Sequence, residues 1–461
     1  MHIIKSIAFA CAVFCATQAH ALDGATTNAT PLKVYVSGAS ALSGSINGLL
    51  TQNCIATTRT TYTYTQIYPG TTSAAAFGTL NSCSLISGND FGLPANTNIV
   101  FQKRDAGGSG VGVYPVSNGT PIDFINPASC TGPASGTGTC TSLFLKAADG
   151  GVSDVEPALF AAIQNTPPES SGSAVGNQAT SQPINQTIFG LAVTNVLYTA
   201  LQTEQGLTAT QRPNISQAVA GQMLRNNFLT DPVAWKLLLP NASATAQNSQ
   251  VTICRRVNGS GTQASANRYF LEYPFNSGSE QLPLAAGDST VTTHGTAANQ
   301  LFVVENSATA DSRNCMTAAN TAGGFALGHI SLENAETAAW KFVKVGGQEP
   351  SRDEAKAGRY AYFFESTGQI FNGAPANVKS FLTSFFNGAG LPANLAQLSA
   401  ANQLGVMARP QTTVCPSVFG SATYSVAAGD AINGPVPAVV NTFCARVTRN
   451  GNSAEFPGFF R

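Results

Sequence analysis

The fold class is decided in the middle of the chain, by the stretch Val251-Thr252-Ile253-Cys254-Arg255-Arg256-Val257-Asn258-Gly259-Ser260-Gly261-Thr262. Its first half is rich in β-branched side chains and predicts a strand. Its second half is a glycine/serine loop, and we expect a helix next, from Gln263 to about Glu272. This order can hold an oxyanion, because glycine lets backbone N–H groups approach and the helix N-terminus adds partial positive charge.

Similar glycine/serine segments lie beside other predicted strands. They cover residues 37–40, 107–110 and 151–154. A single segment of this kind is an ordinary turn in a chain with 44 glycines. The whole set is more specific, because Arg256 and Asp154 accompany it. Strands alternate with helical periods along the chain, which predicts an α/β fold.

The loops resemble, in chain order, those of periplasmic phosphate-binding proteins, the solute receptors of ABC-type phosphate importers. Arg256 to Thr262 is similar to the family's R-x-x-G-S-G-T anion loop. Four shorter segments also resemble family motifs: 37–41, 107–110, 152–154 and 325–330. The resemblance runs from residue 32 to about 390 and implies a two-lobed type II periplasmic-binding-protein clamshell. In that fold two α/β lobes, joined by two interlobe crossings, close on the ligand.

The resemblance gives the residues of the central loop a role in phosphate binding. Arg256 would donate two N–H groups to the anion. Ser260 and Thr262 would donate their hydroxyls, and the backbone N–H groups of Gly261 and Thr262 would lie at a helix start.

Three further residues would complete the site. Ser40 and Ser109 would donate hydroxyls from the other lobe. Asp154 would accept the proton that hydrogen phosphate carries, which favours phosphate or arsenate over sulfate, because sulfate has no proton to give. The alternative for Asp154 is a helix cap ahead of a helix expected from Glu156 to Ile163.

The sequence departs from the family pattern at three places. Leu42 stands where the family has a threonine hydroxyl, so Ser43 or backbone N–H groups would have to replace it. Gly108 stands where a serine is expected. Asn258 replaces the aspartate beside the family's arginine.

The first residues predict export. Lys5 provides a basic start, and the apolar run 7–16 is too short to span a bilayer. Ala19-His20-Ala21 is typical of a cleavage site, so residues 1–21 are expected to be a signal peptide and the mature protein to be periplasmic or secreted. No later apolar run is long enough for a membrane helix, so we do not expect a membrane-embedded protein.

Eight of the ten cysteines lie beyond the predicted signal peptide. An even number in an exported chain predicts disulfides. Pairing neighbours in sequence closes the shortest loops, and gives Cys54–Cys83, Cys130–Cys140, Cys254–Cys315 and Cys415–Cys444. A metal site or cofactor is not expected, because the sequence has no C-x-x-C and the mature chain holds only His294 and His329.

Length and charge bound the function. A chain of 461 residues is too long for one core, and we expect a first lobe from 22–165 with 335–461 and a second lobe from 166–334. Insertions at 52–98 and 110–142 read as disulfide-tied surface loops. With 23 basic and 23 acidic residues, the chain lacks the positive charge of a nucleic-acid binder.

The leading hypothesis is a phosphate receptor that serves a membrane ABC permease. The alternatives are a clamshell for another oxyanion, such as sulfate, molybdate or a phosphonate, and an exported surface or structural protein that has kept the fold. An enzyme is not expected. His329 reads as a packing residue, and neither mature histidine is near a G-x-S-x-G motif, which argues against a Ser-His-Asp hydrolase.

Overall fold

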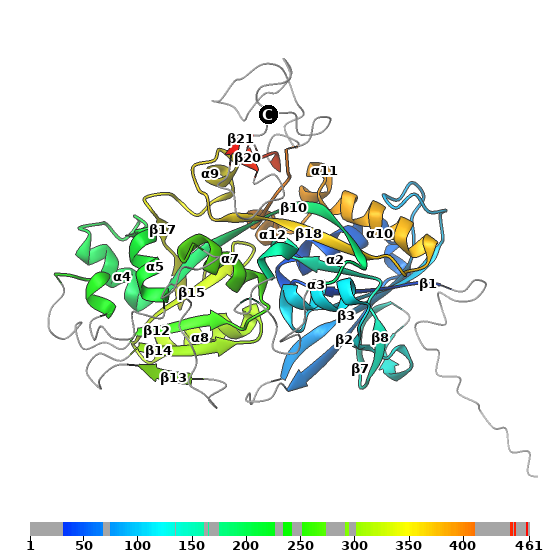
Figure 1. Cartoon of the computed structure of the whole chain (residues 1–461), viewed down its shortest axis with the longest axis horizontal. Coiled ribbons are helices and arrows are strands. Elements are labelled where there is room, and N and C mark those ends of the chain that lie inside the picture. Colours follow the sequence, from blue (N-terminus) through cyan, green and yellow to red (C-terminus); the bar gives the residue numbers. More distant parts are fainter. Residues whose placement is uncertain are drawn as a thin grey trace, which may run out of the picture.

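The computed structural model describes residues 31–67, 74–133, 135–160, 165, 175–225, 234–241, 251–272, 291–294, 301–410, 443–445, 447–448 and 458–459. The predicted signal peptide lies outside these residues. The described strands form one large sheet of 15 strands with helices packed against it, and three two-stranded sheets (Figure 1). The expected α/β fold class is therefore confirmed.

The first lobe is built on parallel strands. Strand β1 (Leu32–Gly38) lies between β4 (Asn98–Arg104) and β9 (Gly150–Ser153) and runs parallel to both. Side chains alternate across β1, as they must in a strand. Val34 and Val36 join the core under helices α2 (Ser43–Asn53) and α10 (Ala376–Ala389). Tyr35 faces the other side and clusters with Val116 of α3 (Gly108–Asn118). Helices thus cover both faces of these strands, as parallel sheets require.

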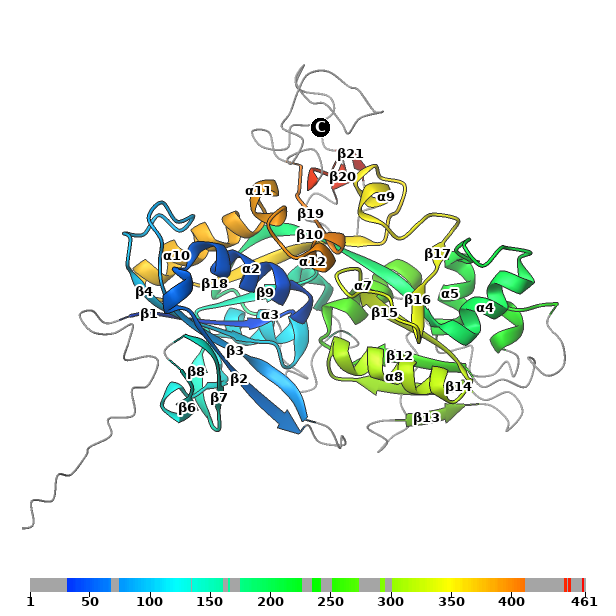
Figure 2. The ribbon, with the colours of Figure 1, turned by 180° about the vertical axis from the view of Figure 1, so that it is seen from behind.

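The second lobe repeats this plan. Strand β12 (Val251–Arg256) lies between β14 (Leu301–Asn306) and β15 (Phe325–Ser331) and is parallel to both. The helices are α4 (Asn195–Glu204), α5 (Gln217–Leu224), α7 (Gly261–Phe270) and α8 (Thr309–Thr321). They enclose a separate core, which also takes in Val113 and Tyr114 of α3. Figure 2 shows the two lobes side by side, with α8 and β14 on one and α2 and α3 on the other.

One long strand, β10 (Ala179–Thr194), belongs to both lobes. Its first part pairs antiparallel with β18 (Phe363–Phe371), and its second part pairs antiparallel with β15. The chain returns to the first lobe through β18. Two crossings therefore join the lobes, as expected.

The lobe boundaries at 165 and 334 stay a prediction. Strand β16 (Trp340–Phe342) pairs with the second-lobe end of β10, and β17 (Lys344–Val345) pairs with β11 (Asn214–Ile215). These pairings favour a return to the first lobe nearer Tyr362 than 334.

The expectation of surface loops at 52–98 and 110–142 is wrong. Strands β2 (Thr60–Ile67) and β3 (Ala74–Ser84) extend the main sheet beyond β4, and they bury Tyr62 and Leu80. Residues 110–118 belong to α3. The rest of the second insertion holds β5 (Pro121–Ile125), β6 (Cys130–Thr131) and β7 (Gly136–Cys140). The threonine- and tyrosine-rich composition suits a pleated sheet, and it outweighed the turn residues on which the loop prediction rested.

Three predicted disulfides are confirmed: Cys54–Cys83, Cys130–Cys140 and Cys254–Cys315. Cys444 is also disulfide-bonded, whereas its predicted partner Cys415 lies outside the described residues. The first two bonds hold the strands of the insertions, and the third joins β12 to α8.

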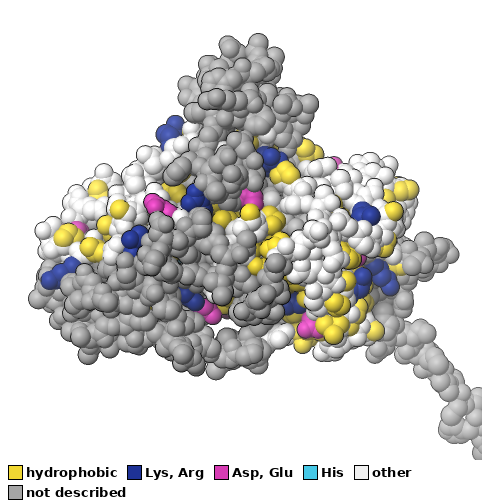
Figure 3. Space-filling view, in the orientation of Figure 1, with side chains coloured by type: hydrophobic (Ala, Val, Ile, Leu, Met, Phe, Trp, Pro, Cys, Tyr) yellow, Lys and Arg dark blue, Asp and Glu magenta, His cyan; other side chains and the backbone are white. Residues whose placement is uncertain are grey.

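The remaining elements are short. The expected helix at 156–163 is, within the described residues, the 3-10 helix η4 (Pro157–Phe160). Other short elements are η1 (Ser40–Leu42), β8 (Leu143–Ala147), β13 (Val291–His294), α9 (Arg352–Lys356), α11 (Pro392–Leu395), α12 (Ala400–Leu404) and β19 (Val406–Met407). None of the helices in the described ranges has the length and hydropathy to cross a membrane. Charged side chains are sparse on the face in Figure 3, as the composition predicts.

Candidate functional site

The lobes touch through two glycine loops, one after β4 and one after β12. Gly107 and Gly108 begin α3 with φ of 89° and 66°, a left-handed conformation that glycine adopts readily. The backbone N–H of Gly110 donates to the carbonyl of Gly259 across 2.7 Å. A Cβ on Gly108 would lie 3.1 Å from the Cα of Ser260. Glycine thus allows backbone-to-backbone contact between the two lobes.

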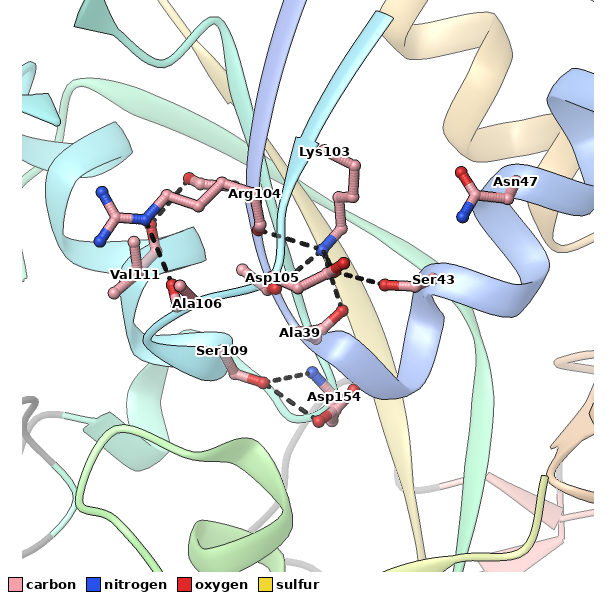
Figure 4. A network of polar contacts seen from close by, with 12 residues as sticks. Ala39, Ser43, Asn47, Lys103, Arg104, Asp105, Ala106, Ser109, Val111 and Asp154 are labelled. Atoms are coloured by element: carbon pink, nitrogen blue, oxygen red, sulfur yellow. Dashed lines mark hydrogen bonds and ion pairs between the residues drawn. The ribbon is translucent and has the colours of Figure 1, made fainter. Parts of the chain in front are cut away.

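Three predicted site residues meet at this contact. The Ser109 Oγ lies 3.2 Å from Asp154 Oδ2 and accepts from the Asp154 N–H at 3.1 Å (Figure 4). A Cβ on Gly261 would lie 2.3 Å from Ser109 Oγ and 2.8 Å from the Asp154 Cβ. Residues far apart in sequence, from α3, from the end of β9 and from the start of α7, therefore contact one another.

Asp154 is a buried carboxyl group. Burial raises its pKa to about 6, while the Arg256 charge, the Ser109 hydrogen bond and the Lys103 charge act in the opposite direction. Its Oδ1 has no hydrogen-bond partner among the described residues. An acidic group with these properties can exchange a proton with a ligand close to neutral pH.

Arg256 is buried behind the same contact. Its Nε donates to the Asn306 carbonyl at 3.2 Å, one Nη to the Thr309 hydroxyl at 2.9 Å and the other to the Ser307 carbonyl at 2.9 Å. Burial lowers its pKa to about 10, against the opposing charges of Asp154 and Asp311. The guanidinium therefore ties β12 to the start of α8 and stays charged at neutral pH.

The neighbouring arginine points elsewhere. Arg255 is paired with Glu305 of β14 at 2.5 Å. Because successive side chains of a strand alternate, Arg255 and Arg256 lie on opposite faces of β12. The two residues thus differ in role as the sequence register predicts.

The remaining residues of the central loop begin helix α7. The Ser260 Oγ accepts from the Gln263 N–H at 3.4 Å and caps the helix, and its own proton is left to donate. Thr262 is buried in the first turn. Gly261 is in contact with Ser109 and Asp154, as described above.

Ser40 lies apart from these residues. It is half-buried at the start of η1 and lines a cavity between the lobes together with Asp105 and Thr309. No described contact joins Ser40 to Ser109 or Asp154. The structure brings Ser109, Asp154 and Gly261 into contact, with the charge of Arg256 acting on Asp154, and leaves Ser40 to one side.

The sequence did not predict that Lys103 lies in the polar network beside the site. Its buried ammonium group donates to the carbonyls of Gly38 and Ala39 at 2.8 and 3.1 Å and to Asp105 Oδ1 at 2.7 Å (Figure 4). Ser43 donates to the same Asp105 oxygen at 2.5 Å, so its proton is not directed at the predicted anion position. The available signal was a lysine within an otherwise buried strand, because a buried charge needs specific partners.

The structure agrees with the packing role predicted for His329. His329 is buried beside Phe270 and Tyr362, and burial lowers its pKa to about 3. It is therefore a packing residue, as predicted. The His294 side chain lies outside what is described. Among the described residues no group of three histidines, cysteines or carboxylates is arranged to hold a metal.

Comparisons with known proteins give structural likenesses alone. No family model and no curated protein matches the chain. An ABC-type phosphate transport receptor from Vibrio cholerae is similar at 11% identity over 52% of this chain and 74% of its own, with a TM-score of 0.29. PstS from Borrelia burgdorferi is similar at 12% identity over 77% of this chain and 92% of its own, with a TM-score of 0.32.

Proposed function

We propose that this protein is an exported solute-binding protein that holds phosphate between its two lobes and presents it to a membrane ABC permease. The observation that carries the proposal is the meeting of Ser109 and Asp154 from one lobe with Gly261 from the other. The buried guanidinium of Arg256 lies close enough to affect the pKa of Asp154.

The chemistry of this cluster suits hydrogen phosphate. Arg256 supplies a buried positive charge, and the first turns of α3 and α7 supply N–H groups at the same place. Asp154 supplies an acceptor for the phosphate proton. Sulfate would meet the same carboxylate without a proton to share, and the resulting repulsion would weaken its binding. The proposed role is binding and not catalysis.

The disulfides support the location. Three of them fit an oxidising compartment, as a periplasmic or secreted protein requires. Signal-peptide cleavage near Ala21 and the permease partner belong to the proposal.

The test is calorimetric titration of residues 22–461 with phosphate, arsenate and sulfate, after bound phosphate has been removed and assayed. Phosphate and arsenate should bind, and sulfate should bind much more weakly. A preference for sulfate or molybdate would favour a receptor for another oxyanion. Binding of none of these ions would favour a surface or structural protein that has kept the fold.

We also propose that ligand binding draws the lobes together by a hinge motion. The segments on either side would be 22–165 with 335–461, and 166–334. Small-angle scattering of phosphate-free and phosphate-saturated protein should give a smaller radius of gyration with ligand. An unchanged radius would argue against closure.

A further inference from the structure

A cavity of about 440 Å³ opens between the lobes beside the anion cluster. This volume lies within the range of small-molecule sites, about 300–1,000 Å³, and is far more than one phosphate ion occupies. Its walls come from both lobes. Ser40, Ser43 and Asp105 line it from the first lobe, and the start of α8, residues 307–311, lines it from the second.

The cavity borders the proposed phosphate site and shares two wall residues with it. Ser307 and Thr309 line it and are also the residues to which Arg256 donates. Glu333 lines it as well; burial raises the pKa of Glu333 to about 7, and the charge of Asp154 acts in the same direction. A ligand with its phosphate at Asp154 and Arg256 could therefore extend into this space.

The described part of the lining presents carboxylate, amide and hydroxyl groups among small alanine and glycine residues, and carries no lysine, arginine or aromatic side chain. The carboxylates and amides in it are Asp105, Asp311, Glu333, Asn314, Asn334 and Asn402. Lys103 lies behind Asp105, but its ammonium group is already bound to two carbonyls and to that carboxylate. A second anionic group would therefore meet only like charge here.

The lining also offers unused hydrogen-bonding groups. The side-chain amides of Asn314 and Asn402 make no hydrogen bond to any described residue, and Glu333 Oε2 has no partner there either. Asp105, by contrast, already accepts hydrogen bonds from Lys103 and Ser43. Asp311 already accepts from the Ser307 hydroxyl and the Ala308 N–H. The amides of Asn314 and Asn402 and the Oε2 of Glu333 can therefore bind hydroxyl or ammonium groups of a ligand.

We propose that the cavity holds the organic half of a small phosphate monoester bearing hydroxyl or amino groups, with its phosphate at the Arg256–Asp154 cluster. This inference rests on the proposed phosphate-binding function and goes further in naming the ligand class. The ester must carry a proton to pair with Asp154 as hydrogen phosphate does, so binding is tested near pH 6, close to the second pKa of about 6 for a phosphate monoester.

The test compares four probes by calorimetry with residues 22–461: inorganic phosphate, glycerol 3-phosphate, phosphoethanolamine and 3-phosphoglycerate. Glycerol 3-phosphate or phosphoethanolamine should bind about tenfold or more tightly than phosphate. Tighter binding of glycerol 3-phosphate would indicate a ligand with hydroxyl groups, and tighter binding of phosphoethanolamine would indicate an amine. 3-Phosphoglycerate should lose this advantage, because its carboxylate faces Asp105 and Asp311.

A matched pair of variants on α8 assigns the effect to the cavity. Asn314 is exposed and lines the cavity, and Ala318 is exposed on the same helix outside the lining. Asn314→Phe should lower ester affinity about tenfold more than phosphate affinity, whereas Ala318→Phe should change neither. Thermal unfolding of both variants controls for folding.

Two results separate the inference from the function beneath it. If phosphate binds but neither ester binds more tightly, or Asn314→Phe acts on both ligands alike, the cavity is a solvent-filled entrance and the inference is wrong while the phosphate receptor stands. If no phosphate-containing probe binds, the proposed function itself fails.

Discussion

The loop after β4 follows a buried lysine, Lys103, and the loop after β12 follows a buried arginine, Arg256. Both loops join a parallel strand to a helix through glycine, and both cations are buried. Lys103 donates to the carbonyls of Gly38 and Ala39, at the end of β1, and to Asp105 in the loop after β4. Arg256 makes three bonds to Asn306, Ser307 and Thr309, out of the five N–H groups that a guanidinium has.

The two cations follow similar strand–loop–helix segments but differ in how many of their N–H donors are already bonded. The three donors of the Lys103 ammonium group are satisfied by the backbone at the end of β1 and by Asp105, so Lys103 holds these two segments together. Arg256 uses three of its five N–H groups in these bonds, which leaves two for the proposed ligand, and its charge acts on the pKa of Asp154. We therefore expect the lysine to matter most for folding and the arginine most for binding, and the predictions below test this division.

The largest effect is expected from Lys103→Met. It leaves Asp105 and the carbonyls of Gly38 and Ala39 without their cation, and breaking a buried pair in this way costs about 3–5 kcal/mol of the free energy of unfolding. Urea denaturation measures the loss. The double variant Lys103→Met/Asp105→Asn should recover part of it. Full stability with loss of phosphate binding would instead make Lys103 a ligand-binding residue.

Arg256→Ala should weaken phosphate binding by about 2–5 kcal/mol, because it removes charge-assisted donors from a buried anion. Arg255→Ala is the matched control. It loses the pair with Glu305 on the opposite face of β12, so phosphate affinity should change little. Calorimetry of both variants decides the matter, and equal losses would show that Arg256 does not face the ligand.

Asp154 should make the ligand-free protein less stable as pH rises. Its folded pKa of about 6 is above the ordinary value of 3.8, so between these values the folded state holds more protons than the unfolded state. Stability therefore falls from about pH 4 to pH 6, by up to about 3 kcal/mol. Asp154→Asn should remove most of this slope in urea denaturation.

The same variant tests selectivity at neutral pH. Asp154→Asn removes the repulsion of sulfate and should narrow the preference for phosphate in a competition titration. A variant with unchanged selectivity would mean that Asp154 does not face the anion.

Gly261→Ala should have the smallest effect, about 1–3 kcal/mol on phosphate binding. The new methyl group would lie 2.3 Å from Ser109 Oγ, so the two loops must move apart. Gly388→Ala in α10 is the control, since its Cβ would meet nothing closer than 3.4 Å. Equal affinity in Gly261→Ala and wild type would show that the loops need not touch for binding.

Much of the architecture follows from local pattern in the sequence. β-branched residues marked β12, and the glycine/serine loop after it marked the start of a helix, because strand propensity and turn composition are local properties of the chain. Sequence-adjacent cysteine pairing is confirmed for three disulfides, two of which close short loops. The glycine/serine loops could be recognised because their composition reflects a local backbone requirement.

Only the tertiary structure decided how the loops combine. No local signal shows that Gly261 lies against Ser109 and Asp154, since these residues meet through the pairing of separate strands. For the same reason the sequence did not reveal the role of Lys103, whose partners come from the end of β1 and from the loop after β4. Strand pairing also explains why the insertion at 52–98 forms sheet. A threonine-rich segment becomes a strand when a neighbouring strand edge is there to pair with it.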